Sequence, residues 1–312
     1  MFHLHPFFVR NFIYPLYRGF RQDRLLEILE ELERDQWLAR SEIEDIQWMK
    51  LKSLLEYVER YVPYYRELFR EHGISADRIE GPSDFAKIPL LSKELIRANK
   101  DRLVTEDPTR RGFPSSTGGS TGEPLYFFGD VSSGPVRRAN TLRCYRWTGV
   151  DIGEPKAFLW GTSLNIPLRK RVVDGVKNLF NNILYLSTFD MSEEAIERHI
   201  VKLRRFRPSV LTAYPSALET LAGYCSSNRG CRFGLKTIVT SGETLFPHQR
   251  ELFEKVFDAP VFDRYGSREF STVAHECARH NGLHIFSDLF YVEVLDEEGN
   301  PVAPGESGEL VI

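Results

Sequence analysis

The chain has 312 residues, of which 27% are charged, and its formal net charge is −3. This length allows a large buried core, and the near balance of charges argues against nucleic acid as a partner. No uninterrupted apolar run approaches the roughly 18 residues of a membrane span. The four cysteines contain no CxxC pair, which is typical of a reducing compartment, so we expect a cytoplasmic protein.

The first twenty residues are rich in aromatic side chains and contain Arg10 and Arg18. Pro6, Arg10 and Asn11 interrupt the apolar run that a signal peptide would need. Two interpretations are open: an arm that packs on the protein's own surface, or an interfacial anchor at a membrane, where aromatic and arginine side chains are favourable. We favour the arm, and therefore a protein that does not associate with membranes.

Residues 21–60 form the first predicted helix, because leucine and isoleucine recur near the helical period until Pro63 ends the pattern. The segment from there to residue 103 is predicted as mixed helix and loop. We therefore divide the chain into residues 1–60, an aromatic arm followed by a helix, and residues 61–312, the main domain.

Residues 115–124 read SSTGGSTGEP and combine three glycines with five serine or threonine residues. Such a loop lets the backbone approach a ligand, and its N–H and hydroxyl groups can hold the phosphates of a nucleotide. The glycine spacing fits neither the Walker loop nor the dinucleotide fingerprint. A flexible linker is the alternative, although the strand-like residues 125–128 favour a loop held between ordered elements.

From residue 192 onward, helix and strand patterns alternate. Helix starts are predicted at Ser192, Pro215 and Pro247. Strands are predicted at residues 209–213, 235–240 and 260–263. The alternation predicts an α/β fold with a largely parallel sheet flanked by helices. The motifs TSGE (240–243) and YGSRE (265–269) follow two of these strands, where ligands bind in such sheets.

The end of the chain changes character. Residues 290–295 and 309–312 read as strands, with a turn at residues 297–300 between them, which predicts a β-meander near the C-terminus. The chain stops within an apolar strand, so we expect a truncated protein.

These motifs, in this order, resemble the adenylate-forming enzymes, which include acyl-CoA synthetases, luciferases and peptide-synthetase adenylation domains. The branch they resemble is the phenylacetate–CoA ligase-like one, with its capsule and exopolysaccharide biosynthesis members. The similarity extends from about Ile46 to the last residue. Further matching segments are VPYYRELF (62–69), IPLLSKELIR (88–97), AYPSALETLA (213–222), HECARHNGLHI (275–285) and GESGEL (305–310).

The resemblance implies the large N-terminal domain of an ATP-dependent, AMP-forming carboxylate ligase. Such an enzyme makes an acyl-adenylate and passes the acyl group to CoA or another acceptor. Its ligands would be ATP or AMP, Mg²⁺ and a small carboxylic acid, in capsule or exopolysaccharide biosynthesis as one setting. Two alternatives are open: a non-catalytic nucleotide-binding relative in polysaccharide assembly, and a glycan acyl- or aminoacyltransferase that uses no ATP. The oligomeric state is open, a dimer included.

The resemblance assigns the nucleotide contacts to the glycine-rich loop and to the two later motifs. These residues are Ser116, Thr117, Gly118, Gly119, Ser120, Thr121, Gly122, Ser241, Gly242, Glu243, Tyr265, Gly266 and Ser267. It assigns the acyl pocket to Trp160, Tyr214, Pro215 and Ser216. For Trp160 and Tyr214, ordinary core packing is the alternative.

Three residues are assigned catalytic roles: Glu269 as the Mg²⁺ ligand, Arg268 as a phosphate or carboxylate donor, and Thr117 as a hydroxyl donor. Most relatives have threonine in place of Arg268, and the wider superfamily has lysine in place of Leu125. No lysine follows Lys255, and the family's small second domain with its catalytic lysine is missing. We therefore expect the chain alone to be inactive.

His275, Glu276, Cys277, His280 and His284 form the one metal-like cluster in the sequence. Some phenylacetate-type relatives hold a structural zinc with Cys and His from this segment, which makes Cys277 and His284 candidate zinc ligands. The alternative is a set of surface histidines around one buried cysteine.

Overall fold

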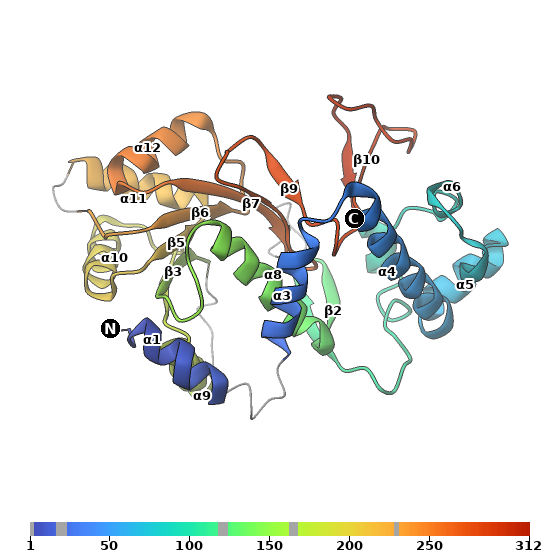
Figure 1. Ribbon diagram of the computed structural model, residues 1–312, viewed down its shortest axis with the longest axis horizontal. Helices are drawn as coiled ribbons and strands as arrows, with labels where there is room; N and C mark the ends of the chain where they lie inside the picture. Colours follow the sequence, from blue (N-terminus) through green and yellow to red (C-terminus); the bar gives the residue numbers. More distant parts are fainter. Residues whose placement is uncertain (1–2, 17–23, 118–123, 162–167, 228–230) are drawn as a thin grey trace. The chain divides into compact units, whose positions relative to one another are not determined.

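The computed structural model describes residues 3–16, 24–117, 124–161, 168–227 and 231–312 (Figure 1). The chain forms two compact units. The sheet unit comprises Met1–Leu29, Arg138–Ser267 and Thr272–His284, and the helical unit comprises Glu30–Arg137, Arg268–Ser271 and Ile285–Ile312. No helix in the described ranges is long and apolar enough to cross a membrane.

A seven-stranded sheet with the order β4-β3-β5-β6-β7-β8-β9 forms the core of the sheet unit. The first five strands in that order run parallel to their neighbours. The strands are β3 (Lys156–Trp160), β4 (Ile183–Ser187), β5 (Val210–Ala213), β6 (Thr237–Ser241), β7 (Val261–Ser267), β8 (Ser271–Glu276) and β9 (Leu283–Ile285). The predicted α/β fold with a largely parallel sheet is confirmed.

Helices pack on both faces of this sheet, and all but the first of them cross between its parallel strands. They are α8 (Gly134–Trp147), α9 (Leu168–Phe180), α10 (Glu193–Phe206), α11 (Pro215–Ser227) and α12 (Pro247–Phe257). The last three cover one face, and their buried side chains, Leu203, Leu218 and Phe253 among them, form one core with the strands. On the other face Tyr145 of α8 packs against Val210 and Val239.

The predicted helix starts in this region are confirmed. The Ser192 hydroxyl accepts the backbone N–H of Ala195, and Pro215 and Pro247 are the first residues of their helices. These signals are local, and proline and capping serine act on the first helical turn in any context. The structure adds β4 and α9, which the sequence patterns did not predict.

The helical unit contains most of the N-terminal half of the chain. Its helices are α3 (Leu25–Asp35), which begins in the sheet unit, α4 (Arg40–Tyr61), α5 (Pro63–His72), η2 (Ala76–Arg78), α6 (Pro82–Phe85) and α7 (Lys93–Ala98). The single helix predicted over residues 21–60 is therefore two helices. The break is stabilised because the Glu42 carboxylate accepts the N–H of Ala39, where α4 begins.

Two antiparallel strand pairs complete the helical unit. β1 (Gly112–Ser116) pairs with β2 (Tyr126–Asp130), which leads through η3 (Val131–Ser133) into α8. β10 (Glu293–Leu295) pairs with β11 (Glu309–Val311), as the predicted C-terminal meander requires. The predicted turn between them is present, because Asp296 Oδ1 accepts the backbone N–H groups of Glu298 and Asn300.

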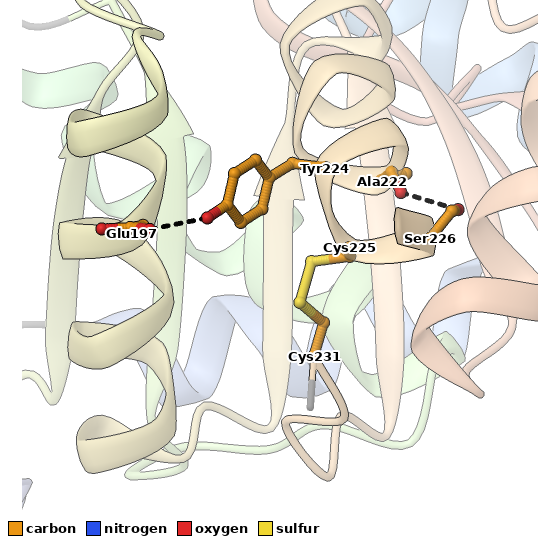
Figure 2. Close-up of a disulfide and its surroundings, with 6 residues drawn as sticks. All are labelled: Glu197, Ala222, Tyr224, Cys225, Ser226 and Cys231. Carbon is orange, nitrogen blue, oxygen red and sulfur yellow. Dashed lines mark hydrogen bonds between the residues drawn. A yellow bond between two sulfur atoms is a disulfide. The ribbon is translucent and has the colours of Figure 1, made fainter. Parts of the chain in front are cut away.

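A disulfide joins Cys225, near the end of α11, to Cys231, with 5.5 Å between their Cα atoms (Figure 2). Beside it, the Tyr224 hydroxyl donates to Glu197 of α10 at 2.8 Å. The sequence had indicated reduced cysteines throughout, because no CxxC pair is present. The structure corrects this for one pair. Cys225 and Cys231 lie six positions apart, and their Cα atoms are close enough for a disulfide.

Candidate functional site

The order of strands in the sheet reverses at β3 and β5. From β3 the chain crosses through α9 to β4 on one side, and from β5 it crosses through α11 to β6 on the other. In open α/β sheets, ligands bind beyond the carboxyl ends of the strands at such a switch point. Trp160 ends β3 and Tyr214 follows β5, so both lie at this place.

Trp160 and Tyr214 stack on each other at the switch point. Their ring centroids are 3.9 Å apart and their planes meet at 23°. Both residues are only partly buried. Gly161 lies beside the pair, 3.9 Å separating its ideal Cβ position from the Tyr214 hydroxyl. The stack therefore places a partly exposed pair of aromatic rings at the strand ends.

The TSGE motif lies next to this stack. Ser241 ends β6 and is buried, and Gly242 has φ = +86°. Glu243 accepts two hydrogen bonds from Ser216, one from the backbone N–H at 2.9 Å and one from the hydroxyl at 2.8 Å. This pair of bonds fixes the first turn of α11 to the loop that follows β6.

Position 242 requires glycine, both because of its backbone conformation and because of the side chains around it. A Cβ at this position would lie 2.8 Å from Tyr214 Cε1, and the ring cannot move away freely because Trp160 stacks on it. We expect Gly242→Ala to lower the free energy of unfolding by about 2–4 kcal/mol, combining backbone strain with overpacking. Urea unfolding would measure this loss. Gly223→Ala is the control, since no atom lies within 4 Å of its Cβ position on α11. An equal, small effect of both changes would contradict the account.

The YGSRE motif begins at the carboxyl end of β7 and continues into the helical unit. Tyr265 is 44% exposed and Ser267 ends the strand. Two positions earlier, Asp263 accepts the Thr240 hydroxyl at 2.9 Å, which joins β7 to β6. Burial raises the pKa of Asp263, and the nearby Glu276 carboxylate adds to the shift, against the hydrogen bonds from Thr240 and Arg264. The partly buried carboxyl group of Asp263 thus lies within the sheet, two positions before the YGSRE motif.

In the helical unit, the base of the glycine-rich loop is closed by its own hydrogen bonds. Ser116 ends β1, and the backbone N–H of Thr117 donates to the Leu125 carbonyl at 3.0 Å. The Thr117 hydroxyl accepts the Leu125 N–H at 2.9 Å. A loop held between two ordered strands is thus favoured over a free linker. Gly118, Gly119, Ser120, Thr121 and Gly122 lie outside the described residues.

Arg268 belongs to the same unit and contacts the end of β1. Its guanidinium donates to the Ser116 carbonyl at 2.9 Å, and its own carbonyl accepts from Arg137 at 2.7 Å. The following residue, Glu269, is half-buried and forms no salt bridge among the described residues. Arg268 thus connects YGSRE with the glycine-rich loop, and Glu269 is a carboxylate available to a hard cation.

In residues 275–285, where the sequence suggests a zinc site, the structure has an ion pair between Glu276 and Arg250. Glu276 accepts from Arg250 Nη2 at 2.7 Å and from the Asp263 N–H at 2.7 Å, and His280 lies 3.2 Å away. Burial alone would raise the pKa of Glu276, but these hydrogen bonds outweigh it and hold the pKa below its usual value. Glu276 therefore tethers α12 to the β7–β8 strands.

Cys277 Sγ and His284 Nε2 are 3.2 Å apart. However, the described residues contain no group of three or more His, Cys, Asp or Glu side chains that could hold a metal ion. A structural zinc site needs about four ligands. The zinc expectation for Cys277 and His284 is therefore without support from the structure.

His275 is wholly buried, and burial lowers its pKa from 6.5 to about 4. The unfolded state thus binds more protons than the folded state between these values, so stability falls as the pH drops from 6.5 toward 4. We expect His275→Phe to remove roughly 1 kcal/mol per pH unit from this slope. Unfolding titrations at several pH values would measure it. His248→Gln, at an exposed site, should keep the wild-type slope; an unchanged slope in His275→Phe would contradict the burial argument.

One buried group has no counterpart in the sequence patterns. Arg143 of α8 has no exposed surface, and its guanidinium donates to Asn140 Oδ1 at 2.8 Å. The Asn140 amide in turn donates to the Thr272 carbonyl at 2.8 Å, just after YGSRE. Arginine is rarely buried without polar partners. The only sequence signal for a buried Arg143 is Asn140, three positions earlier on the same side of the helix.

Comparisons with known proteins find similar chains. Residues 183–312 match the family model of the AMP-binding enzymes. The chain is 27% identical over 286 residues to a phenylacetate-coenzyme A ligase of Thermus thermophilus, covering 88% of this chain and 62% of that protein. The chain is therefore similar to AMP-binding enzymes over residues 183–312 and to this ligase over most of its own length.

Protein CapK of Staphylococcus aureus is 25% identical over 227 residues, covering 72% of this chain and 50% of CapK. The chain thus spans 50% and 62% of these two relatives. A crystal structure of 2-hydroxyisobutyryl-CoA ligase with 2-HIB-AMP and CoA superposes with a TM-score of 0.73 at 21% identity, covering 88% of this chain and 60% of the other. That likeness shows that the two chains share a fold, in agreement with the predicted α/β class.

Proposed function

We propose that this chain is the nucleotide-binding part of an ATP-dependent, AMP-forming acid–CoA ligase, with residues 61–312 as the AMP-binding domain. The observation that carries the proposal is the aromatic stack at the β3/β5 switch point, with TSGE and YGS at the ends of the next two strands. This is the place where an α/β sheet binds a ligand, and it is occupied by the motifs that the family uses.

In this proposal the sheet unit binds adenine and the acyl group. Tyr265 stacks on adenine through its exposed ring, and Ser241, Gly242 and Glu243 line the boundary between the base and the acyl group. Trp160, Tyr214, Pro215 and Ser216 line the acyl pocket. The Glu243–Ser216 bonds hold this lining in place before substrate arrives, which reduces the reorganisation that binding requires.

The roles proposed for the helical unit rest on motif order and on its own contacts. Ser116, Thr117 and the glycine-rich loop hold the β- and γ-phosphates, and Arg268 positions that loop through the Ser116 carbonyl. Glu269 fits Mg²⁺, because it is a carboxylate without a salt bridge among the described residues; the ion, when bound, would neutralise phosphate charge. The substrate carboxylate attacks the α-phosphorus, pyrophosphate leaves, and the protein supplies positioning and charge stabilisation.

The second candidate is a non-catalytic nucleotide-binding relative in polysaccharide assembly. Leu125, which stands where the wider superfamily has a lysine, favours it. Both candidates require nucleotide binding, and only the first requires adenylation with a carboxylic acid, ATP and CoA. A cytoplasmic location and a role in capsule biosynthesis belong to the proposal as well.

Nucleotide binding is tested by replacing Tyr265. Stacking of a base on an aromatic side chain contributes about 1–3 kcal/mol, so Tyr265→Ala should weaken AMP binding by about 10-fold to 100-fold in calorimetry. Tyr185→Ala is the matched control, because Tyr185 on β4 has the same exposed fraction of 44% and lies away from the proposed site. Equal affinity of the Tyr265→Ala variant and the wild-type chain would remove the stacking role.

A further inference from the structure

The N-terminal arm is held against the sheet unit along one side. The Leu4 N–H donates to Asn182 Oδ1, and the Asn182 amide donates back to the Leu4 carbonyl, both at 2.8 Å. Val9 is 4% exposed, and Arg10 forms an ion pair with Asp151 at 3.1 Å. The arm therefore packs on the protein's own surface, as the sequence led us to expect.

The other side of the arm exposes large apolar side chains. Phe7, Phe8, Phe12 and Leu16 are 62%, 52%, 49% and 65% exposed. The Phe8 and Phe12 rings stack with 4.9 Å between centroids, and Phe7 lies 6.3 Å from Phe12. The three phenylalanines form an aromatic cluster on the helical run made by α1 (Pro6–Phe8) and η1 (Val9–Ile13), and Leu16 lies three residues after η1. Exposed apolar clusters of this kind mark interaction surfaces.

Helix α9 exposes a second apolar stripe in the same unit. Val173, Val176, Leu179 and Phe180 are 45–49% exposed. Their spacing of three, three and one residues places them on one side of the helix. Asn182, which holds Leu4, lies two positions after the end of α9.

The same two stretches of sequence concentrate positive charge. Residues 1–24 contain four arginines and one aspartate, a net charge of +3. Residues 168–182 contain Arg169, Lys170, Arg171 and Lys177 against Asp174, again +3. The whole chain has a net charge of −3, so both apolar stretches stand out from an acidic remainder. Phenylalanine and leucine beside arginine and lysine are the composition of segments that lie in the interface of anionic membranes.

We propose that the arm and α9 dock this protein on an anionic lipid surface. Phe7, Phe8, Phe12 and Leu16 enter the boundary between head groups and acyl chains, while the net positive charge of both stretches favours a surface of anionic head groups. The contact is interfacial and involves no membrane span. The proposal replaces the expectation that the protein does not associate with membranes, and it is independent of the proposed ligase activity.

The test is co-sedimentation with vesicles of phosphatidylcholine alone and of phosphatidylcholine mixed with phosphatidylglycerol. The wild-type chain should bind the mixed vesicles more tightly. The triple variant Phe7→Ser, Phe8→Ser, Phe12→Ser should lose about 100-fold or more in affinity, because three half-exposed rings no longer leave water. Lys177→Glu, a surface change, should weaken binding to mixed vesicles roughly tenfold and leave binding to neutral vesicles unchanged.

A matched control removes exposed apolar side chains from the helical unit. Trp37, Met49 and Leu54 are 83%, 61% and 54% exposed, and replacing all three by serine should leave vesicle binding as in the wild type. The proposal is overturned if the wild-type chain does not bind mixed vesicles, or if the arm variant binds as well as wild type. It is also overturned if the wild-type chain is a dimer and the arm variant is a monomer with unchanged vesicle binding, because a second copy of the chain then covers the aromatic cluster.

Discussion

Replacing Glu269 by glutamine is expected to lower carboxylate-dependent pyrophosphate release by about 100-fold or more in the gene product that contains this chain. The substitution keeps the shape of the side chain and removes its charge, and losing one electrostatic stabiliser of a phosphoryl-transfer transition state costs about this much. Glu269 is half-buried and free of salt bridges within the described residues, so the effect should fall on the reaction and not on folding.

Glu298→Gln is the control for this experiment, because Glu298 lies exposed in the turn that leads from β10. It should leave single-turnover pyrophosphate release unchanged. A loss of only a few-fold in Glu269→Gln would remove the Mg²⁺ role from this residue. Thermal unfolding of both variants should match the wild type, which separates a catalytic effect from a structural one.

The 312-residue chain is expected to bind nucleotide and yet form hardly any hydroxamate from a panel of carboxylic acids. Leu125 stands where the wider superfamily has a lysine, and no lysine follows Lys255. The Thr117–Leu125 hydrogen bonds show that this part of the loop is used to close its own base. A lysine that neutralises the developing phosphoryl charge would have to be positioned correctly, and correct positioning is worth several orders of magnitude.

The comparison for this second prediction is a protein extended to the length of its curated relatives, of which this chain spans 50% and 62%. That protein should form hydroxamate with at least one acid of the panel. Rapid turnover by the 312-residue chain with ATP and Mg²⁺ would mean that another residue among those present supplies the missing charge.

Much of the fold could be predicted from local signals. Ser192, Pro215 and Pro247 start their helices in the structure because capping and proline act within a single turn. The strand β4 and the helix α9 could not be predicted in this way. β4 is an edge strand that pairs in parallel with β3 alone, and such pairing depends on partners distant in sequence. The break before α4 was also missed, because its stabilising contact is one Glu42 side chain.

The candidate site shows the same division. The sequence predicts TSGE and YGSRE after strands, whereas in the structure both motifs begin within the last residues of β6 and β7, so these strands run further than predicted. The Trp160–Tyr214 stack and the Glu243–Ser216 bonds could not be predicted, because they join segments 54 and 27 positions apart through the order of strands. Glu276 was grouped with candidate metal ligands from its neighbours in sequence, whereas its partner Arg250 lies on α12.

Carboxylate-dependent exchange between ATP and labelled pyrophosphate, measured on the gene product that contains this chain, tests the account most directly. Reversible formation of an acyl-adenylate predicts exchange that requires both Mg²⁺ and a carboxylic acid, and that is lost in Tyr265→Ala and Glu269→Gln. Saturable ATP binding without exchange across a broad panel of acids would contradict the ligase and leave a non-catalytic nucleotide-binding protein.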